Sequence, residues 1–309
     1  MRLDLAVARA FGLSRRAARE AVRAGRIEIS SEVADEPGSD IPEETLPTLK
    51  FHRDRPARRR VRTRLSVLYE DTAVLIVDKP AGLLTVPTEA NEKDTLWARA
   101  LHYLQHRYGG RPYAGIVHRL DKDTSGAVVF ARSRHVLHFL QERFRAHAID
   151  REYVAIARGN VHESGRFDAD LARTPGLRRG IARPGQEGRR AVTRYRTIER
   201  LPGATLVSVR PETGRTHQIR VHFAAAGHPI LGDRVYGEES DAAAAPRQML
   251  HARRLGFPHP ATGEPIAAEA PLPEDFAELL EELRGAKKNA PARPARSGNR
   301  KKRRATRER

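Results

Sequence analysis

One nine-residue, mainly polar run constrains the fold of this chain more than any other stretch. It reads HRLDKDTSG at 118–126, after Ile116 and Val117 and before the apolar run AVVFA at 127–131. Short apolar runs are typical of strands, and Asp, Thr, Ser and Gly are frequent in turns. The sequence therefore predicts a strand, a polar turn and a second strand. The turn is either a plain charged hairpin or a loop that carries chemistry on a rigid support.

The net charge of +18 is concentrated in two short stretches of the 309 residues. Residues 50–64 hold eight lysines and arginines against one aspartate, and residues 285–309 hold eleven against one glutamate. Neither stretch has a hydrophobic period, so we expect a basic linker at 50–64 and a disordered basic tail at 285–309. Such segments on a nearly neutral body favour a polyanionic partner, and a merely solubilising tail is the alternative.

Several classes of protein are excluded or disfavoured. The chain has no cysteine, which excludes disulfides, thiolate catalysis and cysteine-based zinc sites. No apolar run approaches the roughly 18 residues of a membrane span, and the N-terminus lacks the hydrophobic core of a signal peptide. We therefore expect a cytoplasmic protein without membrane association. His217, His222 and His228 have no acid among them and lack the spacing of a helical metal site.

The first 49 residues have the pattern of a small separate unit. Helices are predicted from Leu3 to Phe11 and from Ser14, as the cap, to Gly25, followed by a short strand at 27–29. Four arginines at helical spacing are predicted to share one face: Arg15, Arg19, Arg23 and Arg26. This order resembles the S4 RNA-binding module, and the resemblance implies that these arginines contact RNA. A solvated helix face is the alternative.

Residues 65–284 combine strand and helix patterns without an internal repeat. Strands are predicted at these positions: 65–69, 73–77, 151–157, 191–198 and 205–210. Helices are predicted from Thr95 to Tyr108, after Ser133, and from a Thr216 cap to just before Gly227. Between residues 161 and 190 the composition favours a hairpin with a basic loop.

Three segments of this body match the motifs of one family. HRLDKDTSG at 118–126 resembles the active-site motif of the RluA-type family of RNA pseudouridine synthases, and GRTHQIRVH at 214–222 resembles a second motif. DKPAG at 78–82 resembles the opening motif of that family. The resemblance covers residues 65–284. It implies an α+β catalytic domain with a mixed, largely antiparallel central sheet flanked by helices and loops, preceded by a small α/β S4-like module.

The resemblance also assigns roles to particular residues. Asp121 is expected to be the catalytic residue and Arg220 the cation that pairs with it. Tyr153 is expected to stack on the target base, and Arg119 to face the RNA and hold the helix open once the base has flipped out. Lys79 of DKPAG is interpreted as structural.

The implied chemistry needs one carboxylate and no cofactor. Conversion of uridine to pseudouridine breaks the N1–C1′ bond, rotates the base and joins C5 to C1′, with no redox change and no water consumed. Glycoside hydrolysis normally needs two carboxylates about 5–10 Å apart, so Asp123 is interpreted as structural. Attack on C6, attack on C1′ and deprotonation of C2′ stay open as the step taken by Asp121. A buried guanidinium such as Arg220 would keep that carboxylate ionised and aimed.

Three functions compete: an RNA pseudouridine synthase, a non-catalytic RNA-binding protein associated with the ribosome, and a glycosidase of small molecules. The presence of Asp121, Tyr153 and Arg220 together favours the first over the second, and the basic segments disfavour the third. Members of the family with an S4 module tend to modify large-subunit ribosomal RNA, which is therefore the expected partner, with transfer RNA as the alternative. No obligate protein partner is implied, and we expect a monomer.

Overall fold

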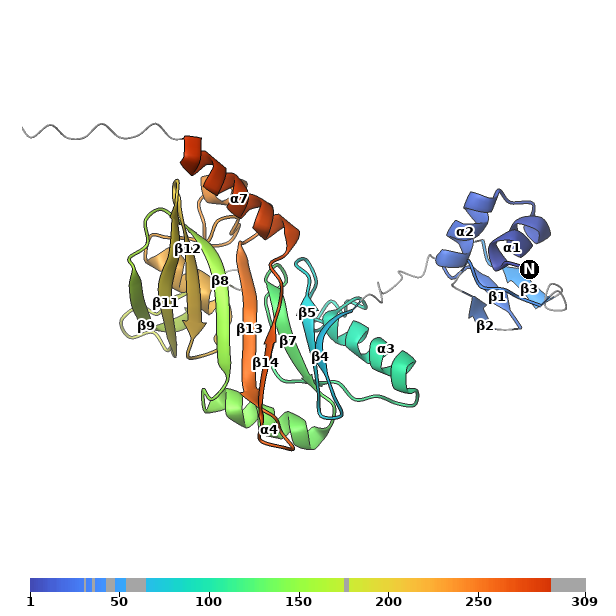
Figure 1. Cartoon of the computed structure of the whole chain (residues 1–309), viewed down its shortest axis with the longest axis horizontal. Coiled ribbons are helices and arrows are strands. Elements are labelled where there is room, and N and C mark those ends of the chain that lie inside the picture. The colour runs from blue at the N-terminus through green and yellow to red at the C-terminus, as the bar shows by residue number, and fades with distance from the viewer. Residues whose placement is uncertain (31, 35–36, 43–47, 54–64, 175–177, 290–309) are drawn as a thin grey trace, which may run out of the picture.

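The computed structural model describes the chain except for residues 31, 35–36, 43–47, 54–64, 175–177 and 290–309. The described residues form two separate sheets, one before residue 54 and one after residue 64, and each unit is described by itself (Figure 1). Among the described helices, none is both long and apolar enough to cross a membrane.

The N-terminal unit packs two helices against an antiparallel sheet with the strand order β2-β1-β3. Its elements are α1 (Leu3–Phe11), α2 (Arg15–Arg23), β1 (Ile27–Ile29), β2 (Glu32–Ala34) and β3 (Leu49–Phe51). The predicted caps are confirmed: the Ser14 hydroxyl accepts a hydrogen bond from the Ala17 N–H, and Gly25 has a φ of 66° just after α2. Buried aliphatic side chains such as Val22 and Ile27 give this unit its own core.

The unit extends past the boundary predicted at residue 49. Strand β3 pairs with β1 as far as Phe51, and the His52 N–H donates to the Arg26 carbonyl. The His52 ring also lies 2.9 Å from the Glu28 carboxylate. The sequence analysis assigned residues 50–52 to the linker because they belong to a basic stretch and a strand of three residues gives no clear alternation. The rest of that linker, residues 54–64, lies outside the described residues.

A buried carboxylate ties the two helices together. Asp4, in the first turn of α1, is fully buried and accepts hydrogen bonds from the Nε atoms of Arg19 at 2.7 Å, Arg15 at 3.2 Å and Arg2 at 3.3 Å. Burial alone would raise the pKa of Asp4, but these guanidinium groups outweigh it and lower the pKa to about 2. Arg15 and Arg19, predicted to contact RNA, therefore also stabilise the helix pair.

Asp4→Asn is expected to lower the free energy of unfolding of the N-terminal unit by about 1.5–3 kcal/mol, the usual contribution of a hydrogen bond to a charged group. Because the pKa of Asp4 is lowered on folding, its stabilisation is present at neutral pH and is lost as the pH falls towards 2. Hydrogen–deuterium exchange of the full chain at pH 7 would show faster exchange of the α1 and α2 amides. Glu20→Gln, which breaks only an exposed pair with Arg16, is the control. Equal exchange in both variants would contradict this role of Asp4.

The second unit is built on an eleven-stranded mixed sheet with the order β10-β9-β11-β12-β8-β13-β7-β5-β4, with β14 beside β13 and β6 beside β7. Its strands are β4 (Ser66–Glu70), β5 (Val74–Lys79), β6 (Gly115–Ile116), β7 (Ser125–Ala131), β8 (Asp150–Arg158), β9 (Ser164–Arg173), β10 (Arg179–Ile181), β11 (Arg189–Leu201), β12 (Ala204–Pro211), β13 (Leu250–Pro258) and β14 (Pro265–Glu269). Its helices are α3 (Leu96–Tyr108), α4 (Arg134–Arg145), α5 (Gln218–Ala225), α6 (Glu239–Ala243) and α7 (Glu274–Asn289). Every pairing is antiparallel except that of β13 with β7, so the predicted mixed, largely antiparallel sheet is confirmed.

The parallel pairing of β7 and β13 depends on a glycine of the polar run. Gly126 lies beside Ala252 of β13 and has a φ of 115°. A Cβ atom on Gly126 would lie 2.2 Å from the Ala252 carbonyl oxygen, so no other residue fits without moving a strand. All seven residues of β7 are buried, and the loop that precedes them is thereby attached to the centre of the sheet.

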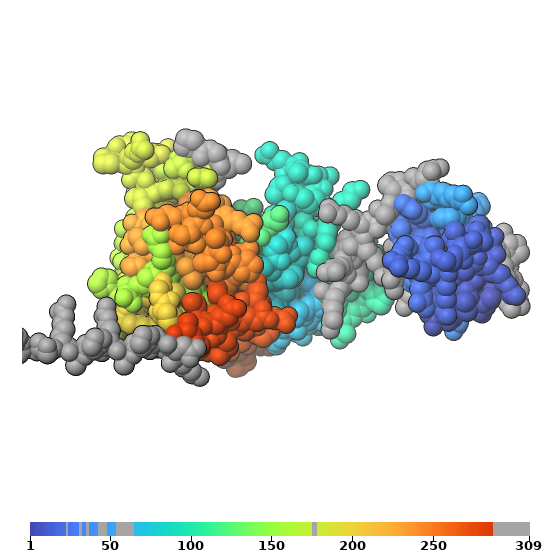
Figure 2. Space-filling view, turned by 90° about the horizontal axis from the view of Figure 1, so that it is seen from above, coloured from blue at the N-terminus to red at the C-terminus, as the bar shows by residue number. Residues whose placement is uncertain are grey.

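Two helices differ from their predicted bounds. Helix α5 begins at Gln218, and its N-cap is His217 in the left-handed conformation instead of Thr216. Helix α7 continues to Asn289, into the segment predicted as a tail from 285, because the alanine and lysine that follow Gly285 propagate a helix readily. Figure 2 shows α7, in red, against the orange segment that holds Arg247, which pairs with Asp275 of α7 at 2.7 Å. Residues 290–309 lie outside the described residues.

Candidate active site

The site is a cavity of about 1550 Å³ between the loop that leads into β7 and the start of α5. Four side chains predicted from the sequence line it together: Asp121, Arg220, Tyr153 and Arg119. They come from segments up to 101 residues apart in sequence, which the sheet brings to one place.

The backbone on both sides of Asp121 is held by side chains from other elements. The Thr85 hydroxyl donates to the Leu120 carbonyl at 2.9 Å and accepts from the Leu120 N–H at 3.1 Å. Lys79, which is fully buried, donates from Nζ to the carbonyls of Lys122 at 2.7 Å and Leu83 at 2.6 Å. Burial lowers the pKa of Lys79 to about 7, although nearby carboxylates oppose this effect. The loop can therefore present Asp121 with little freedom of its backbone.

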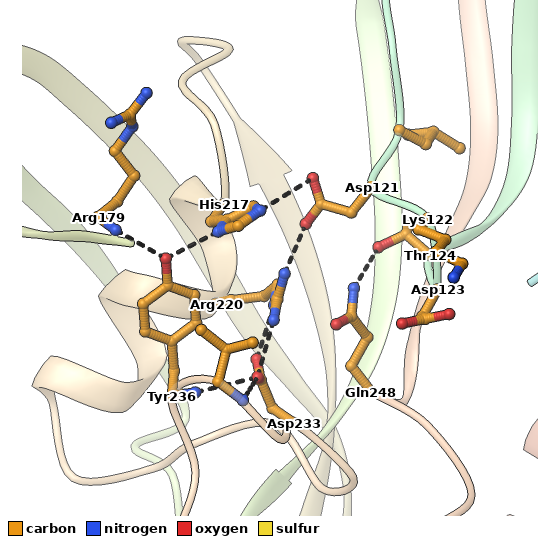
Figure 3. A network of polar contacts seen from close by, with 12 residues as sticks. Asp121, Lys122, Asp123, Thr124, Arg179, His217, Arg220, Asp233, Tyr236 and Gln248 are labelled. Carbon is orange, nitrogen blue, oxygen red and sulfur yellow. Dashed lines mark hydrogen bonds and ion pairs between the residues drawn. The ribbon is translucent and has the colours of Figure 1, made fainter. Parts of the chain in front are cut away.

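A second pair of contacts fixes the end of the loop. Gln248 donates from Nε2 to the Thr124 hydroxyl at 2.9 Å (Figure 3), and Arg247 donates from Nη1 to the Asp123 carbonyl at 3.1 Å. The sequence reading assigned neither Arg247 nor Gln248 a role, and no local pattern distinguishes them. Their importance follows only from β13, which brings them beside the loop.

Arg220 lies between two carboxylates (Figure 3). Its Nη1 donates to Asp121 Oδ2 at 3.0 Å, while Nε and Nη2 donate to the two oxygens of Asp233 at 2.7 and 2.8 Å. Asp233 is fully buried, whereas the Asp121 side chain is 25% exposed. Burial alone would lower the pKa of Arg220, but the hydrogen bonds and charge of Asp233 together with Asp121 outweigh it and raise the pKa. The arginine therefore stays charged and aimed at Asp121.

Asp233 was missed as a site residue. It follows Gly232, eleven residues after the end of the segment at 214–222, and the sequence analysis assigned it no role. A buried arginine needs all of its donors satisfied, and Asp121 alone cannot occupy the Nε side of the guanidinium. That requirement is the signal that could have pointed to a second carboxylate.

Tyr153 projects from β8, which lies between β12 and β13, and is half-buried against two hydrophobic clusters of the core. Burial raises the pKa of its phenol, so the ring is neutral near pH 7. Arg119 is exposed at the same cavity and makes no described contact with Asp121. Both placements suit the roles that the sequence predicts, a flat face for a base and a cation at the rim.

His118 and Arg151 are structural neighbours of the site. His118 Nε2 accepts the Val129 N–H at 3.2 Å, and its ring stacks on Phe144 at 4.8 Å. Burial, with Arg151 close by, lowers the pKa of His118 to about 3, so the ring keeps the lone pair that this bond needs. Arg151 lies 5.3 Å from the Phe144 ring centre, and its Nη2 donates to the Pro211 carbonyl at 3.0 Å.

The three histidines near α5 have separate partners. His217 Nδ1 lies 2.7 Å from the Tyr236 hydroxyl, His222 Nδ1 lies 2.9 Å from the Thr193 hydroxyl, and His228 Nδ1 lies 2.9 Å from the Arg158 carbonyl. They do not converge on one point. Within the described residues, no group of three or more histidines and acids could hold a metal ion.

Comparisons with known proteins match the chain to one family. The family model described as RNA pseudouridylate synthase matches residues 73–225, and the S4 domain model matches residues 1–45. The chain is 44% identical over 232 residues to Ribosomal large subunit pseudouridine synthase D of Xanthomonas campestris pv. campestris, which covers 71% of this chain and 70% of the relative. The chain belongs to the RNA pseudouridylate synthase family.

A second relative and a solved structure agree with this assignment. The protein of the same name from Nitrosomonas europaea is 40% identical over 237 residues, covering 74% of this chain and 68% of that relative. The structure titled Human RNA Pseudouridylate Synthase Domain Containing 1 matches with a TM-score of 0.56 at 26% identity, over 72% of this chain and 95% of that one. The predicted family, fold and enzyme class are confirmed: this synthase is an isomerase that acts on RNA and carries an N-terminal S4 domain.

Arg220→Met is expected to destabilise the synthase by about 3–5 kcal/mol, the cost of leaving a buried charge without its partner. Most of that cost comes from Asp233, because it is fully buried and Asp121 is not. Urea unfolding followed by fluorescence of Trp97, the single tryptophan, reports on this unit. Arg134→Met, at the exposed start of α4, is the control. Equal unfolding midpoints for the two variants would show that the ion pairs of Arg220 do not stabilise this unit.

Proposed function

We propose that this synthase modifies uridine in large-subunit ribosomal RNA with Asp121 as its catalytic residue. The observation that carries the proposal is the placement of Asp121: a partly exposed carboxylate on a rigid loop, bonded through Oδ2 to a buried arginine, in an open cavity. Its other oxygen, Oδ1, has no described hydrogen bond within 3.5 Å and is free to react. A single carboxylate of this kind is sufficient for a reaction in which the detached uracil rejoins the same ribose and no water is consumed.

The reaction balances within the nucleotide and the solvent. The N1–C1′ bond breaks, the base turns, C5 bonds to C1′, and the C5 proton leaves while N1 gains one. Asp121 acts as a nucleophile at C6 or C1′ or as a base at C2′, and each role needs one ionised oxygen facing the substrate. Arg220 holds Oδ2 of Asp121 in place for these steps, and Asp233 balances the charge of Arg220 itself.

Tyr153 and Arg119 complete the proposed active site. The target uridine must leave the helical stack to reach Asp121, and a flipped base is held well by an aromatic face. Tyr153 offers such a face inside the cavity. Arg119, exposed at the rim, would take the place that the base leaves and contact the surrounding RNA.

The S4 domain and the basic segments would bind RNA phosphates. Arg15 and Arg19 use Nε on Asp4 in the described contacts, while their side chains stay 50% and 40% exposed. Their remaining donors are therefore proposed to contact phosphate, and Arg26 and Arg23 to extend that surface, although the side chain of Arg23 lies outside the described residues. Replacing Arg15 and Arg19 with acids would also remove their hydrogen bonds to Asp4, so that change would not test RNA binding alone.

Ribosomal RNA is proposed as the substrate because relatives at 40–44% identity carry the name ribosomal large subunit pseudouridine synthase D. Transfer RNA is the alternative. A ribosomal RNA substrate implies action in the cytoplasm, and a monomer without an obligate protein partner remains our prediction. Pseudouridine mapping of total RNA from cells with and without the gene tests the substrate. We expect the difference to fall in large-subunit ribosomal RNA, and a difference confined to transfer RNA would replace this proposal with the alternative.

Asp121→Asn is expected to abolish pseudouridine formation while RNA affinity stays equal to or slightly above that of the parent. An amide keeps the shape but cannot attack carbon or accept a proton at a useful rate. Tritium release from RNA labelled at uridine C5, beside a binding titration, separates the two effects. Turnover by the Asn variant would overturn the assignment of Asp121.

Tyr153→Ala provides the matched comparison within the same cavity. Loss of a stacking face is expected to weaken the engaged complex by about 1–3 kcal/mol per base. Binding should therefore fall for Tyr153→Ala and not for Asp121→Asn. Loss of binding by both variants in equal measure would mean that Asp121 is structural and would favour a non-catalytic RNA-binding role.

A further inference from the structure

We propose that His217 is a positioning residue for Asp121, with its Nε2–H directed at the oxygen that Arg220 leaves free. The inference rests on the proposed role of Asp121 and adds to it a second donor, which determines where the reactive oxygen points. His217 lines the same cavity, and its Nε2 lies 3.9 Å from Asp121 Oδ1 (Figure 3).

The hydrogen bonds behind the ring determine its tautomer. The Tyr236 hydroxyl accepts the backbone N–H of Arg179 at 2.9 Å and lies 2.7 Å from His217 Nδ1. A phenol has one proton to donate, and His217 Nδ1 is the acceptor within reach. When Tyr236 donates to Nδ1, the imidazole proton must lie on Nε2, the atom that faces Asp121. The opposite tautomer would give the Tyr236 oxygen two donors and leave its own proton without a described acceptor.

The ring is neutral at neutral pH. Burial lowers the pKa of His217, Asp121 opposes this effect, and the charge of Arg220 close by adds to the lowering. A neutral imidazole can donate from Nε2 without placing a second cation beside Asp121. The ion pair with Arg220 thus keeps its strength while the other oxygen gains a donor of moderate strength.

The backbone of His217 is held in an unusual conformation that aims the side chain. Its φ is 58° and its ψ is 16°, in the left-handed region that few residues other than glycine adopt. It serves as the N-cap of α5 without any side-chain cap, although caps are usually extended and use their side chain. Strain of this kind persists where the surroundings require it and is frequent at functional sites.

Gln218 supplies that requirement. Its side chain is buried, accepts from the Thr213 hydroxyl at 2.6 Å and the Arg215 N–H at 3.0 Å, and donates to the Val192 carbonyl at 2.9 Å. The turn that precedes α5 is therefore fixed to β11, which supports the left-handed backbone of His217.

The distance of 3.9 Å between His217 Nε2 and Asp121 Oδ1 is longer than a hydrogen bond, so the bond forms only if the carboxylate turns. Arg220 binds Oδ2 at 3.0 Å, so the carboxylate can still turn about that contact. Rotation of the carboxylate brings Oδ1 towards His217 Nε2. The two donors then hold the carboxylate in one orientation, with Oδ1 at the cavity surface. His217 acts through Asp121 in this scheme and does not itself exchange a proton with the substrate.

The test uses the full-length enzyme and total RNA from cells that lack the gene, labelled at uridine C5. With enzyme in excess, tritium release gives a plateau rate and a half-saturating enzyme concentration. His217→Leu is expected to lower the plateau rate by about 10- to 100-fold, the effect of one hydrogen bond to a charged group, with the half-saturating concentration unchanged. His217→Gln, whose amide nitrogen can replace Nε2, is expected to restore at least half of that loss on a logarithmic scale.

Tyr236→Phe isolates the hydroxyl, because the ring that lies 5.0 Å from the Arg220 guanidinium is kept. This variant is expected to slow the plateau rate in the parent and to have little further effect in the His217→Leu background. Tyr103→Phe removes a hydroxyl bonded to Glu70 outside the cavity and is the matched control, expected to react at the parent rate.

The outcomes separate this inference from the proposed function. If the parent enzyme releases no tritium, the proposed function fails. If the parent is active and His217→Leu reacts at the same rate, the inference is overturned and the function stands. If the double variant slows the plateau rate by the product of the two single-variant factors, the residues act independently, and the link between Tyr236 and His217 is overturned. Equal losses for the Gln and Leu variants, with equal drops in melting temperature, would overturn the positioning role in favour of a structural one.

Discussion

The site depends on one guanidinium with two carboxylates. Arg220 joins the loop before β7, through Asp121, to the turn after α5, through Asp233. The pairing is unequal, because Asp233 is fully buried and bidentate while Asp121 is partly exposed and shares a single bond. Burying Arg220 costs desolvation free energy, and the buried carboxylate of Asp233 offsets that cost. Asp121 then receives a fixed cation without having to be buried itself, which leaves one oxygen open to a substrate.

Rigidity around that carboxylate comes from distant parts of the chain. Lys79 reaches from the end of β5, Thr85 from the loop that follows, and Arg247 from the segment before β13, and each binds a backbone group of the loop at 120–123. None of them contacts the Asp121 carboxylate in the described structure. They hold the backbone so that the side chain needs only Arg220 and, as we infer, His217 to fix its orientation. Such support is what a preorganised active site requires.

Much of the site could be predicted from the sequence, and the misses share one cause. Through their resemblance to family motifs, the run at 118–126 indicated Asp121 and the segment at 214–222 indicated its partner Arg220. The structure places Arg220 Nη1 3.0 Å from Asp121 Oδ2. Asp233 and His217 were not assigned to the site because no role for them came from the resemblance, and their contacts with Arg220 and Asp121 become visible only in the folded chain. The linker boundary at 49 and the Thr216 cap failed for a related reason: three-residue strands and left-handed caps leave almost no periodic signal.

The local elements and the charge distribution follow from the amino-acid sequence, because caps, alternation and turn residues act over a few positions. The resemblance of its motifs to one family indicated the residues able to do the chemistry. Which of those residues meet depends on the packing of the whole chain. Gly126 permits β7 to pair in parallel with β13, and that contact brings Arg247 and Gln248 to the loop. Likewise, two arginines of the predicted RNA-binding face donate hydrogen bonds to the buried Asp4 and so also stabilise the N-terminal unit. Burial and pairing are properties of the packed chain, so a carboxylate's neighbours cannot be read from its sequence position.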